Sequence, residues 1–260
     1  MNLEFHKYQG AGNDFIMVDN RDLKFPSKNY ELVKQLCDRR FGIGADGLIL
    51  VQKSKQFDFE MLYYNADGFE GSMCGNGGRC AFAFAESLSL VKSKSVFLAT
   101  DGPHEAFRNA TEISLKMKDV SGVEKISKDY FLNTGSPHYV RFVDDVQKID
   151  VVKEGRKIRY NARFKKEGTN VNFVEVGKNK LKVRTYERGV EDETLSCGTG
   201  VTAVALVANL KKVNPKSSQF LIETLGGKLR VSFENKAKEE YTSIWLTGPA
   251  SFVYKGNYIY

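Results

Sequence analysis

The pattern of hydrophobic and polar residues predicts a helix and then a strand early in the chain. Residues 30–40 carry apolar side chains at helical spacing, and Gly42 follows as a stop signal. Residues 57–63 instead alternate apolar and polar side chains with a period of two, and turn residues follow at 65–68. We therefore expect a helix, and then a half-buried strand that leads the chain to a glycine-rich segment at 73–79.

A second glycine-rich segment, residues 196–200, precedes the same predicted order of elements. After each segment comes a run of helix-forming residues, then a strand, a short turn and a returning strand. The predicted helices are residues 80–86 and 201–209. The predicted strands are residues 94–100, 105–107, 112–117, 219–224 and 228–233, with turns at 101–102 and 226–227. This recurrence predicts two structurally similar halves.

An upstream pair of segments points to the same duplication. Residues 12–18 resemble residues 169–174, and each places an asparagine before a predicted strand. The spacing from asparagine to cysteine differs, so the architecture is duplicated rather than the sequence. A polar stretch at 120–128 predicts the boundary between two α/β (α+β) domains, which would bring both glycine-rich helix starts to one central cleft. The predicted domains are residues 1–120 and 121–250.

The composition excludes several classes of protein. At 260 residues the chain is long enough for two domains of ordinary size. The first residues lack the apolar stretch of a signal peptide, and the longest apolar run, around 201–208, is too short to span a bilayer. The net charge of +7 is scattered among 32 acidic residues, without a nucleic-acid-binding motif. We expect a cytoplasmic protein whose partner is neither a membrane nor a nucleic acid.

Four cysteines in a chain of this length are too few for a disulfide scaffold, and in the cytosol they stay reduced. Cys74 and Cys197 lie in the two glycine-rich segments, each at the start of a predicted helix. The positive end of a helix dipole and its unpaired N–H groups favour the thiolate form of a cysteine at this position. Cys37 and Cys80 are more simply interpreted as buried core thiols. The sequence thus indicates paired chemistry of two thiols.

The sequence indicates neither a metal nor an organic cofactor. It contains no Cys-x-x-Cys motif and only three histidines, and it lacks a Walker loop and a dinucleotide fingerprint. Two thiols could act on the Cα–H of an amino acid, because a thiolate on one face can take the proton while a thiol on the other face returns one. Backbone N–H groups could then hold the substrate carboxylate. These groups belong to Gly75, Asn76, Gly198 and Thr199.

Several segments together resemble the diaminopimelate epimerase family over nearly the whole chain. They are residues 10–15, 65–68, 73–80, 135–138, 186–189 and 193–200. The resemblance implies interconversion of LL- and meso-2,6-diaminopimelate without pyridoxal phosphate, on the route to lysine and, in many bacteria, peptidoglycan. It implies two similar domains, each a mainly antiparallel sheet wrapped around a central helix, with the active site between them. The last strand, at about 251–260, is expected to return to the N-terminal domain.

The resemblance also assigns roles to individual residues. Cys74 and Cys197 become the two acid/base residues, and His138 and Glu187 support their protonation states. The residues that become substrate contacts are Asn13, Asn65, Gly75, Asn76, Asn170, Glu187, Arg188, Gly198 and Thr199. Independently of the family, Arg188 could bind a carboxylate through two N–H groups, and Glu187 could pair with a substrate ammonium group.

Two residues depart from the family pattern. Gly47 stands where the family commonly has a glutamine that is expected to touch the substrate, and Ser136 replaces an asparagine. Both changes shrink a polar group, and water could fill the space. They bear on which substrate binds more than on the class of reaction.

Plainer interpretations remain for several of these residues. His138 could be a loop residue, Glu187 and Arg188 an exposed ion pair, and Asn13 and Asn170 turn formers or helix caps. The chain could also be a thiol-disulfide redox or sensor protein, although a resolving cysteine or redox motif would then be expected.

A proline or hydroxyproline racemase would use the same two-thiol chemistry, but that family usually has histidine where this chain has Asn76. The expected partner is a small-molecule substrate. The sequence leaves open the oligomeric state, for which a homodimer is the candidate, and which cysteine is the resting thiolate.

Overall fold

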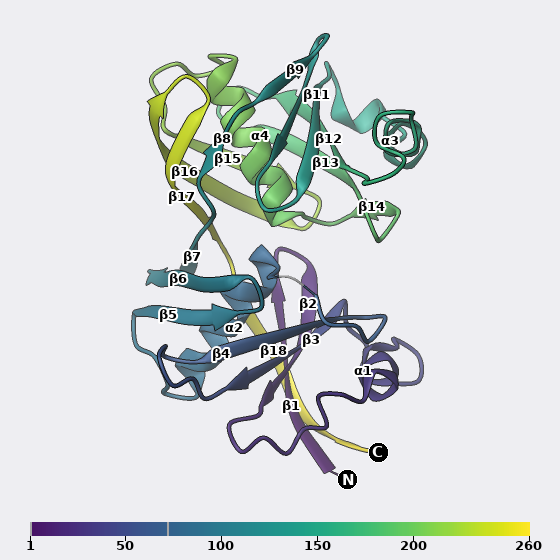
Figure 1. Ribbon diagram of the computed structural model, residues 1–260, viewed down its shortest axis with the longest axis vertical. Coiled ribbons are helices and arrows are strands. Elements are labelled where there is room, and N and C mark those ends of the chain that lie inside the picture. The colour runs from purple at the N-terminus through teal and green to yellow at the C-terminus, as the bar shows by residue number, and fades with distance from the viewer. Residues whose placement is uncertain (1, 72) are drawn as a thin grey trace. The chain divides into compact units, whose positions relative to one another are not determined.

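Two helices in this chain are buried on nearly every face, which requires protein on all sides of each. They are α2 (Gly75–Ser87) and α4 (Gly198–Leu210). The middle of α4 reads Val-Thr-Ala-Val-Ala-Leu-Val-Ala and has no polar face. A helix that is apolar all round must be enclosed. Each of the two contacts several strands of a sheet that curves around it (Figure 1).

The computed structural model describes residues 2–71 and 73–260. The chain divides into two units, one formed by Met1–Leu115 with Gly248–Tyr260 and the other by Lys116–Thr247. In the described residues, no helix is both long enough and apolar enough to cross a membrane.

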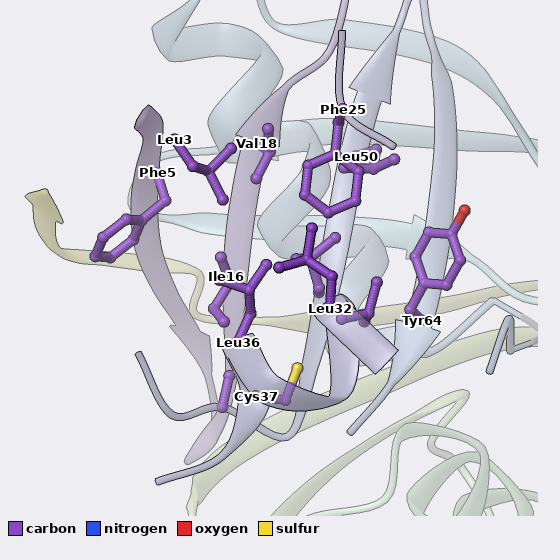
Figure 2. Close-up of a cluster of buried hydrophobic side chains, with 13 residues drawn as sticks. Leu3, Phe5, Ile16, Val18, Phe25, Leu32, Leu36, Cys37, Leu50 and Tyr64 are labelled. Atoms are coloured by element: carbon purple, nitrogen blue, oxygen red, sulfur yellow. The ribbon is translucent and has the colours of Figure 1, made fainter. Parts of the chain in front are cut away.

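The first unit is a mixed sheet with α2 on its inner face. Its strands, in spatial order, are β18 (Ser251–Ile259), β1 (Asn2–Gly10), β2 (Asn13–Asp19), β3 (Gly47–Gln52), β4 (Glu60–Asn65), β5 (Lys94–Ala99), β6 (Gly102–Asn109) and β7 (Glu112–Lys116). Neighbours are antiparallel except in the pairs β2–β3 and β4–β5. The short helix α1 (Tyr30–Cys37) covers the outer face, and Cys37 lies there among apolar side chains (Figure 2).

The second unit repeats this plan around α4. Its strands, in spatial order, are β9 (Glu124–Ile126), β10 (Asp129–Asn133), β11 (Pro137–Phe142), β12 (Asn170–Val176), β13 (Leu181–Glu187), β15 (Gln219–Thr224), β16 (Gly227–Ala237), β17 (Glu240–Gly248) and β8 (Val120–Ser121). The parallel pairs are β11–β12 and β13–β15. The outer helix is α3 (Val151–Arg159), preceded by the short 3₁₀ helix η1 (Val146–Lys148), while β14 (Asp192–Thr194) extends β13 as a hairpin.

The two units share one succession of antiparallel and parallel pairs, so the predicted duplication and fold class are confirmed. Strand β2 corresponds to β11, β3 to β12, and α2 to α4. The upstream sequence match, however, was wrong. It paired residues 12–18, which include most of β2, with residues 169–174, which include most of β12. The match arose because both strands begin at an asparagine, not because they hold equivalent places in the sheet.

Candidate active site

Cys74 and Cys197 hold equivalent positions, each as the N-capping residue of an enclosed helix. The helices begin Gly-Asn-Gly-Gly and Gly-Thr-Gly-Val, so no carboxylate in the first turn offsets the positive end of either dipole. Cys197 is buried and Cys74 half-buried. Both sulfurs therefore lie where a thiolate is favoured.

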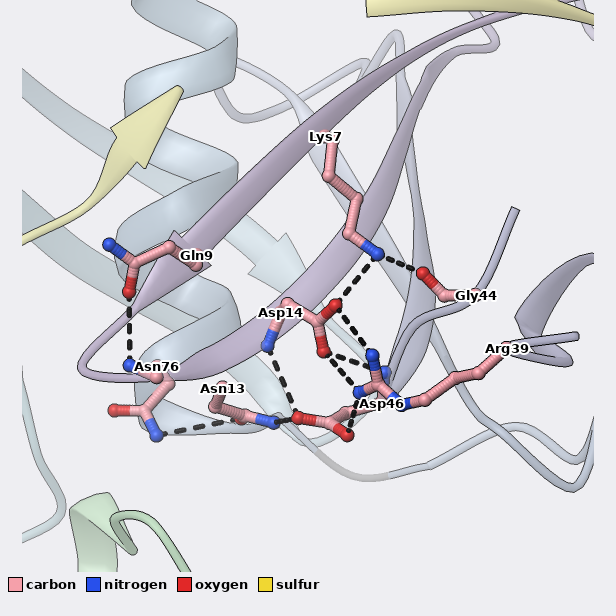
Figure 3. Close-up of polar contacts among 9 residues, drawn as sticks. Lys7, Gln9, Asn13, Asp14, Arg39, Gly44, Asp46 and Asn76 are labelled. Carbon is pink, nitrogen blue, oxygen red and sulfur yellow. Dashed lines mark hydrogen bonds and ion pairs between the residues drawn. The ribbon is translucent and has the colours of Figure 1, made fainter. Parts of the chain in front are cut away.

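A chain of side-chain amides connects Cys74 to the first unit's sheet. Its Sγ donates to Oδ1 of Asn13 at 3.6 Å, and Nδ2 of Asn76 donates to the same oxygen at 3.5 Å. The amide of Asn13 in turn donates to Oδ2 of Asp46 at 2.6 Å. Two of the predicted substrate contacts, Asn13 and Asn76, thus lie together (Figure 3), and Asn13 accepts from the sulfur.

Behind these amides lies a network of two carboxylates and two cations. Arg39 binds both oxygens of Asp14, at 2.6 and 3.1 Å, and reaches Asp46 at 2.7 Å. Lys7 contacts Asp14 at 2.7 Å and donates to the carbonyl of Gly44 (Figure 3). Burial raises the pKa of Asp14, but the hydrogen bonds from Arg39 and Lys7 outweigh it and lower that pKa to about 2. The ionic network fixes the strand end that carries Asn13.

In the second unit a hydroxyl and an imidazole lie beside Cys197. Oγ1 of Thr199 lies 3.4 Å from Sγ of Cys197 and 2.9 Å from Nε2 of His138. His138 belongs to β11 and is fully buried, so it is not a loop residue. The hydroxyl of Thr199 therefore bridges the ring and the sulfur.

The hydrogen bonds of Asn172 assign the tautomer of His138. Oδ1 of Asn172 accepts from the hydroxyl of Thr185 at 3.0 Å, and its Nδ2 donates to the carbonyl of Tyr139 at 3.0 Å. The same Nδ2 lies 3.2 Å from Nδ1 of His138, so that nitrogen accepts and Nε2 carries the proton toward Thr199. Burial lowers the pKa of His138 to about 3, and Arg188 acts in the same direction. The ring is neutral at physiological pH.

The other predicted residues of this unit gather at the same end of the sheet. Asn170 donates through Nδ2 to Oγ of Ser136 at 2.9 Å, and its Oδ1 accepts the backbone N–H of Arg188 at 2.8 Å. The guanidinium of Arg188 donates to the carbonyl of Glu167 at 2.9 Å, and Glu187 accepts from Thr194 at 2.8 Å. The side chain of Asn170 thus holds the backbone of Arg188 in position.

Comparison with known proteins identifies the family. The family model described as diaminopimelate epimerase matches residues 5–107 and 130–253. The chain belongs to the diaminopimelate epimerase family. It is 52% identical to the diaminopimelate epimerase of Flavobacterium psychrophilum over 97% of this chain and 99% of that protein.

Solved structures show how widely the fold of the diaminopimelate epimerase family is shared. A phenazine biosynthesis protein of the PhzF family from Bacillus anthracis superimposes with a TM-score of 0.78 at 13% identity, covering 100% of both chains. A hydroxyproline epimerase from Agrobacterium vitis gives a TM-score of 0.70 at 11% identity, covering 98% of this chain and 92% of that one. At such identities the likeness extends to the fold alone.

The departure from the diaminopimelate epimerase pattern at Gly47 has a structural explanation. A Cβ at Gly47 would lie 2.6 Å from Cε2 of Tyr63 and 2.5 Å from the carbonyl oxygen of Tyr64. A Cβ at Gly71 would likewise meet the Tyr63 ring at 2.8 Å and Nδ2 of Asn65 at 2.9 Å. Water was expected to fill this space, but the ring of Tyr63 occupies it beside the predicted substrate contact Asn65.

Three features of the site were not predicted from the sequence. They are Arg79, Asn172 and the contacts of the Thr199 hydroxyl, since only the backbone N–H of Thr199 was expected to act. Arg79 is fully buried and donates to the carbonyls of Gly75 at 3.1 Å and Pro249 at 3.3 Å, and to Oδ1 of Asn76 at 2.8 Å. The available signal was an arginine directly before the apolar run of residues 80–85. No comparable signal marked Asn172, because only the sheet brings it to His138.

Proposed function

We propose that this chain interconverts LL- and meso-2,6-diaminopimelate without a cofactor. The observation that carries the proposal is its 52% identity, over nearly the full length of both chains, to a diaminopimelate epimerase. The two cysteines that cap enclosed glycine-rich helices support the same reaction. We further propose that the protein works in the cytoplasm, where thiols stay reduced and remain available as acid and base.

In this mechanism one sulfur is a thiolate and the other a thiol. The thiolate takes the α-proton from one face of the substrate, and the electron pair of the broken C–H bond delocalises into the α-carboxylate. The thiol then donates its proton to the opposite face, which inverts the centre and exchanges the roles of the sulfurs. The proposal requires Cys74 and Cys197 to reach opposite faces of the same carbon.

The first turns of α2 and α4 stabilise the charge that develops on the carboxylate. The first N–H groups of a helix have no intrahelical acceptor and point along the positive end of its dipole. In this mechanism Gly75 and Asn76 on one helix, and Gly198 and Thr199 on the other, donate to the carboxylate as its negative charge grows. Donors that are already oriented stabilise the transition state more than the ground state.

The distal amino-acid end of the substrate selects for diaminopimelate. In this proposal Arg188 binds the distal carboxylate, Glu187 pairs with the distal ammonium group, and amides complete the subsite. The amides are those of Asn13, Asn65 and Asn170. His138 supports Cys197 as a neutral ring through Thr199.

Proton NMR in deuterated, reducing buffer tests the proposal. We expect LL-diaminopimelate to lose its α-proton signal while the meso isomer appears. Exchange with L-proline but not with diaminopimelate would refute the substrate. Folded protein that exchanges neither substrate, and whose cysteines cycle through a disulfide under physiological reductant, would refute the reaction class.

A further inference from the structure

Two glycines leave a slot beside the sheet of the first unit, and the ring of Tyr63 fills it. A Cβ at Gly47 would lie 2.6 Å from Cε2 of the ring and 3.2 Å from its hydroxyl oxygen. A Cβ at Gly71 would lie 2.8 Å from Cε1 on the other edge of the ring. While the ring stays in this place, neither position has room for a side chain.

The ring leans along the sheet toward the strand end at which the predicted substrate contacts lie. Tyr63 of β4 pairs with Ile49 of β3, yet its hydroxyl lies beside Gly47, two residues nearer the start of β3. Gly47 itself pairs with Asn65, the last residue of β4. The ring also meets Phe15 of β2 edge-on, with the ring centroids 6.1 Å apart. The hydroxyl therefore lies where β3 begins and β4 ends.

The start of α2 covers the strand position opposite Tyr63. A Cβ at Gly77, in the first turn of the helix, would lie 3.1 Å from Cδ1 of Ile49 and 3.5 Å from Cβ of Cys74. Tyr63 stands directly opposite that isoleucine on the neighbouring strand. The tyrosine is thus a near neighbour of the Cys74 site, although no hydrogen bond of that site revealed it.

The amide of Asn65 lies beside the same ring. A Cβ at Gly71 would lie 2.8 Å from Cε1 of Tyr63 and 2.9 Å from Nδ2 of Asn65, so the two groups border one point. Both side chains are half-buried, which leaves part of each open to solvent. A phenol O–H and an amide N–H are both donors to a carboxylate. The slot therefore brings two such donors to one end of the sheet.

We propose that Tyr63 is a specificity-determining residue, whose hydroxyl donates a hydrogen bond to the distal carboxylate of diaminopimelate beside Asn65. This inference rests on the proposed function, in which Arg188 binds the same carboxylate. A carboxylate accepts about four hydrogen bonds, so one guanidinium leaves acceptors for further donors. The phenol also takes the place of a side chain at position 47, where the diaminopimelate epimerase pattern commonly has glutamine.

Removal of the hydroxyl alone separates hydrogen bonding from packing. Tyr63→Phe keeps the ring between the two glycines, so the fold should persist by circular dichroism and thermal unfolding. We expect KM for LL-diaminopimelate to rise by about tenfold or more, because the carboxylate loses a charge-assisted hydrogen bond. The value of kcat should change by less than about threefold, because the hydroxyl contacts a group remote from the reacting carbon.

Two results would contradict the role of this hydroxyl. An unchanged KM in folded Tyr63→Phe protein would mean that the ring only fills the space left by the glycines. A loss confined to kcat would place the hydroxyl at the reacting carbon and not at the distal end. Either result overturns the inference.

Tyr64→Phe is the matched control for loss of a tyrosine hydroxyl. Tyr64 is the next residue of β4, and its side chain lies on the opposite face of the sheet, in the apolar cluster with α1 (Figure 2). This variant should leave KM unchanged. A rise as large as that of Tyr63→Phe would mean that any change in this strand disturbs the site, and would also overturn the inference.

A second pair of variants changes polarity at nearly constant length. Tyr63→Gln and Tyr63→Met have side chains of similar length, but only glutamine donates to a carboxylate. We expect KM to be lower in Tyr63→Gln than in Tyr63→Met by about threefold or more. Equal values would contradict a hydrogen bond from position 63. This pair decides the matter if Tyr63→Phe does not fold.

Turnover by the wild-type protein keeps this inference distinct from the proposed function. If the wild type epimerises LL-diaminopimelate and KM is unchanged in Tyr63→Phe, only the role of Tyr63 is refuted. If folded, reduced wild-type protein does not epimerise diaminopimelate, the proposed substrate is refuted, and this inference with it.

Discussion

The two cysteine sites share one backbone frame and differ in the side chains that line it. In the first unit, Phe15 lies opposite Gly47 on neighbouring strands, and Met17 lies opposite Ile49. In the second unit the equivalent pairs are His138 opposite Asn170, and Val140 opposite Asn172. Apolar Phe15 and Ile49 are thus replaced by a histidine and an asparagine.

The consequence is that the two units support their cysteines by different physical means. The first surrounds Cys74 with formal charges, from Arg79 to the network of Lys7 and Asp14. The second connects Cys197 through Thr199 to a neutral, fully buried histidine. Both units place a cysteine at the start of an enclosed helix. The side chains on the neighbouring strands then decide whether charged or neutral groups surround that cysteine.

Loss of either cysteine should produce the largest effect. Cys74→Ala and Cys197→Ala should each reduce epimerisation of diaminopimelate by at least about 10³-fold, because each removes one proton-transfer group. Cys80→Ala is the matched control, since this buried thiol on α2 takes no part in the chemistry. The NMR assay measures all three, and near-normal turnover in either of the first two would remove that cysteine from the mechanism.

Asn172→Ile gives the second unit the isoleucine that the first unit has at the equivalent position, Ile49. It leaves His138, Thr185 and the carbonyl of Tyr139 without their partner, and should lower the free energy of unfolding by about 2–4 kcal/mol. The double variant His138→Phe with Asn172→Ile restores the apolar pair of the first unit and should cost less than the sum of the single changes. Urea unfolding measures each, and strict additivity would show that the two residues are not coupled.

Acid should destabilise the second unit through His138. Its pKa is lowered in the folded protein, so the unfolded chain binds a proton first and stability falls as the pH drops below about 6.5 toward the folded value. Between pH 6.5 and 5 the loss should be about 2 kcal/mol. His138→Phe should flatten this slope in urea unfolding, while His6 and His104 remain in both proteins. An unchanged slope would mean that the ring is not held neutral.

Gly77 faces Ile49 and Gly200 faces Asn172, so replacing each glycine by alanine should change stability differently. A Cβ at Gly200 would lie 2.5 Å from Oδ1 of Asn172, whereas the nearest atom to one at Gly77 would be the terminal methyl of Ile49, at 3.1 Å. Alanine gains helix propensity at both positions, so Gly77→Ala should be nearly neutral. Gly200→Ala should cost about 1–2 kcal/mol in thermal or urea unfolding. Equal effects would mean that Asn172 is free to move.

The charged network of the first unit should weaken at low pH. Asp14 has a lowered pKa in the folded protein, so its contribution is complete above the unfolded value of about 4 and is lost as the pH falls through about 2. Asp14→Asn should cost about 1 kcal/mol at pH 7, after allowance for solvent screening, and nothing well below pH 2. Stability curves of both proteins against pH should therefore converge in acid, and parallel curves would contradict the shift.

Local patterns predicted the elements whose burial is dictated by their own sequence. Residues 219–224 form β15 as predicted. Residues 201–209 lie within α4, because a run this rich in apolar residues is stable only when it is enclosed. The alternating run at 57–63 predicted a strand, and the strand observed is shifted to Glu60–Asn65, because its pairing with β3 begins at Glu60 and continues to Asn65. The strands β10, β11 and β13 were not predicted as elements, whereas β12 was predicted as the strand that follows an asparagine.

The family, the two cysteines and the enclosed helices could be predicted from the chain alone, because they depend on residue type and local spacing. Tertiary structure alone decided that β2 corresponds to β11 and not to β12, since strand order is a property of the sheet. It also decided that Tyr63 fills the space at Gly47, that Asn172 sets the tautomer of His138, and that Arg79 is buried among neutral acceptors. Each of these depends on groups far apart in sequence, whose meeting creates the desolvation and hydrogen bonding that set protonation states.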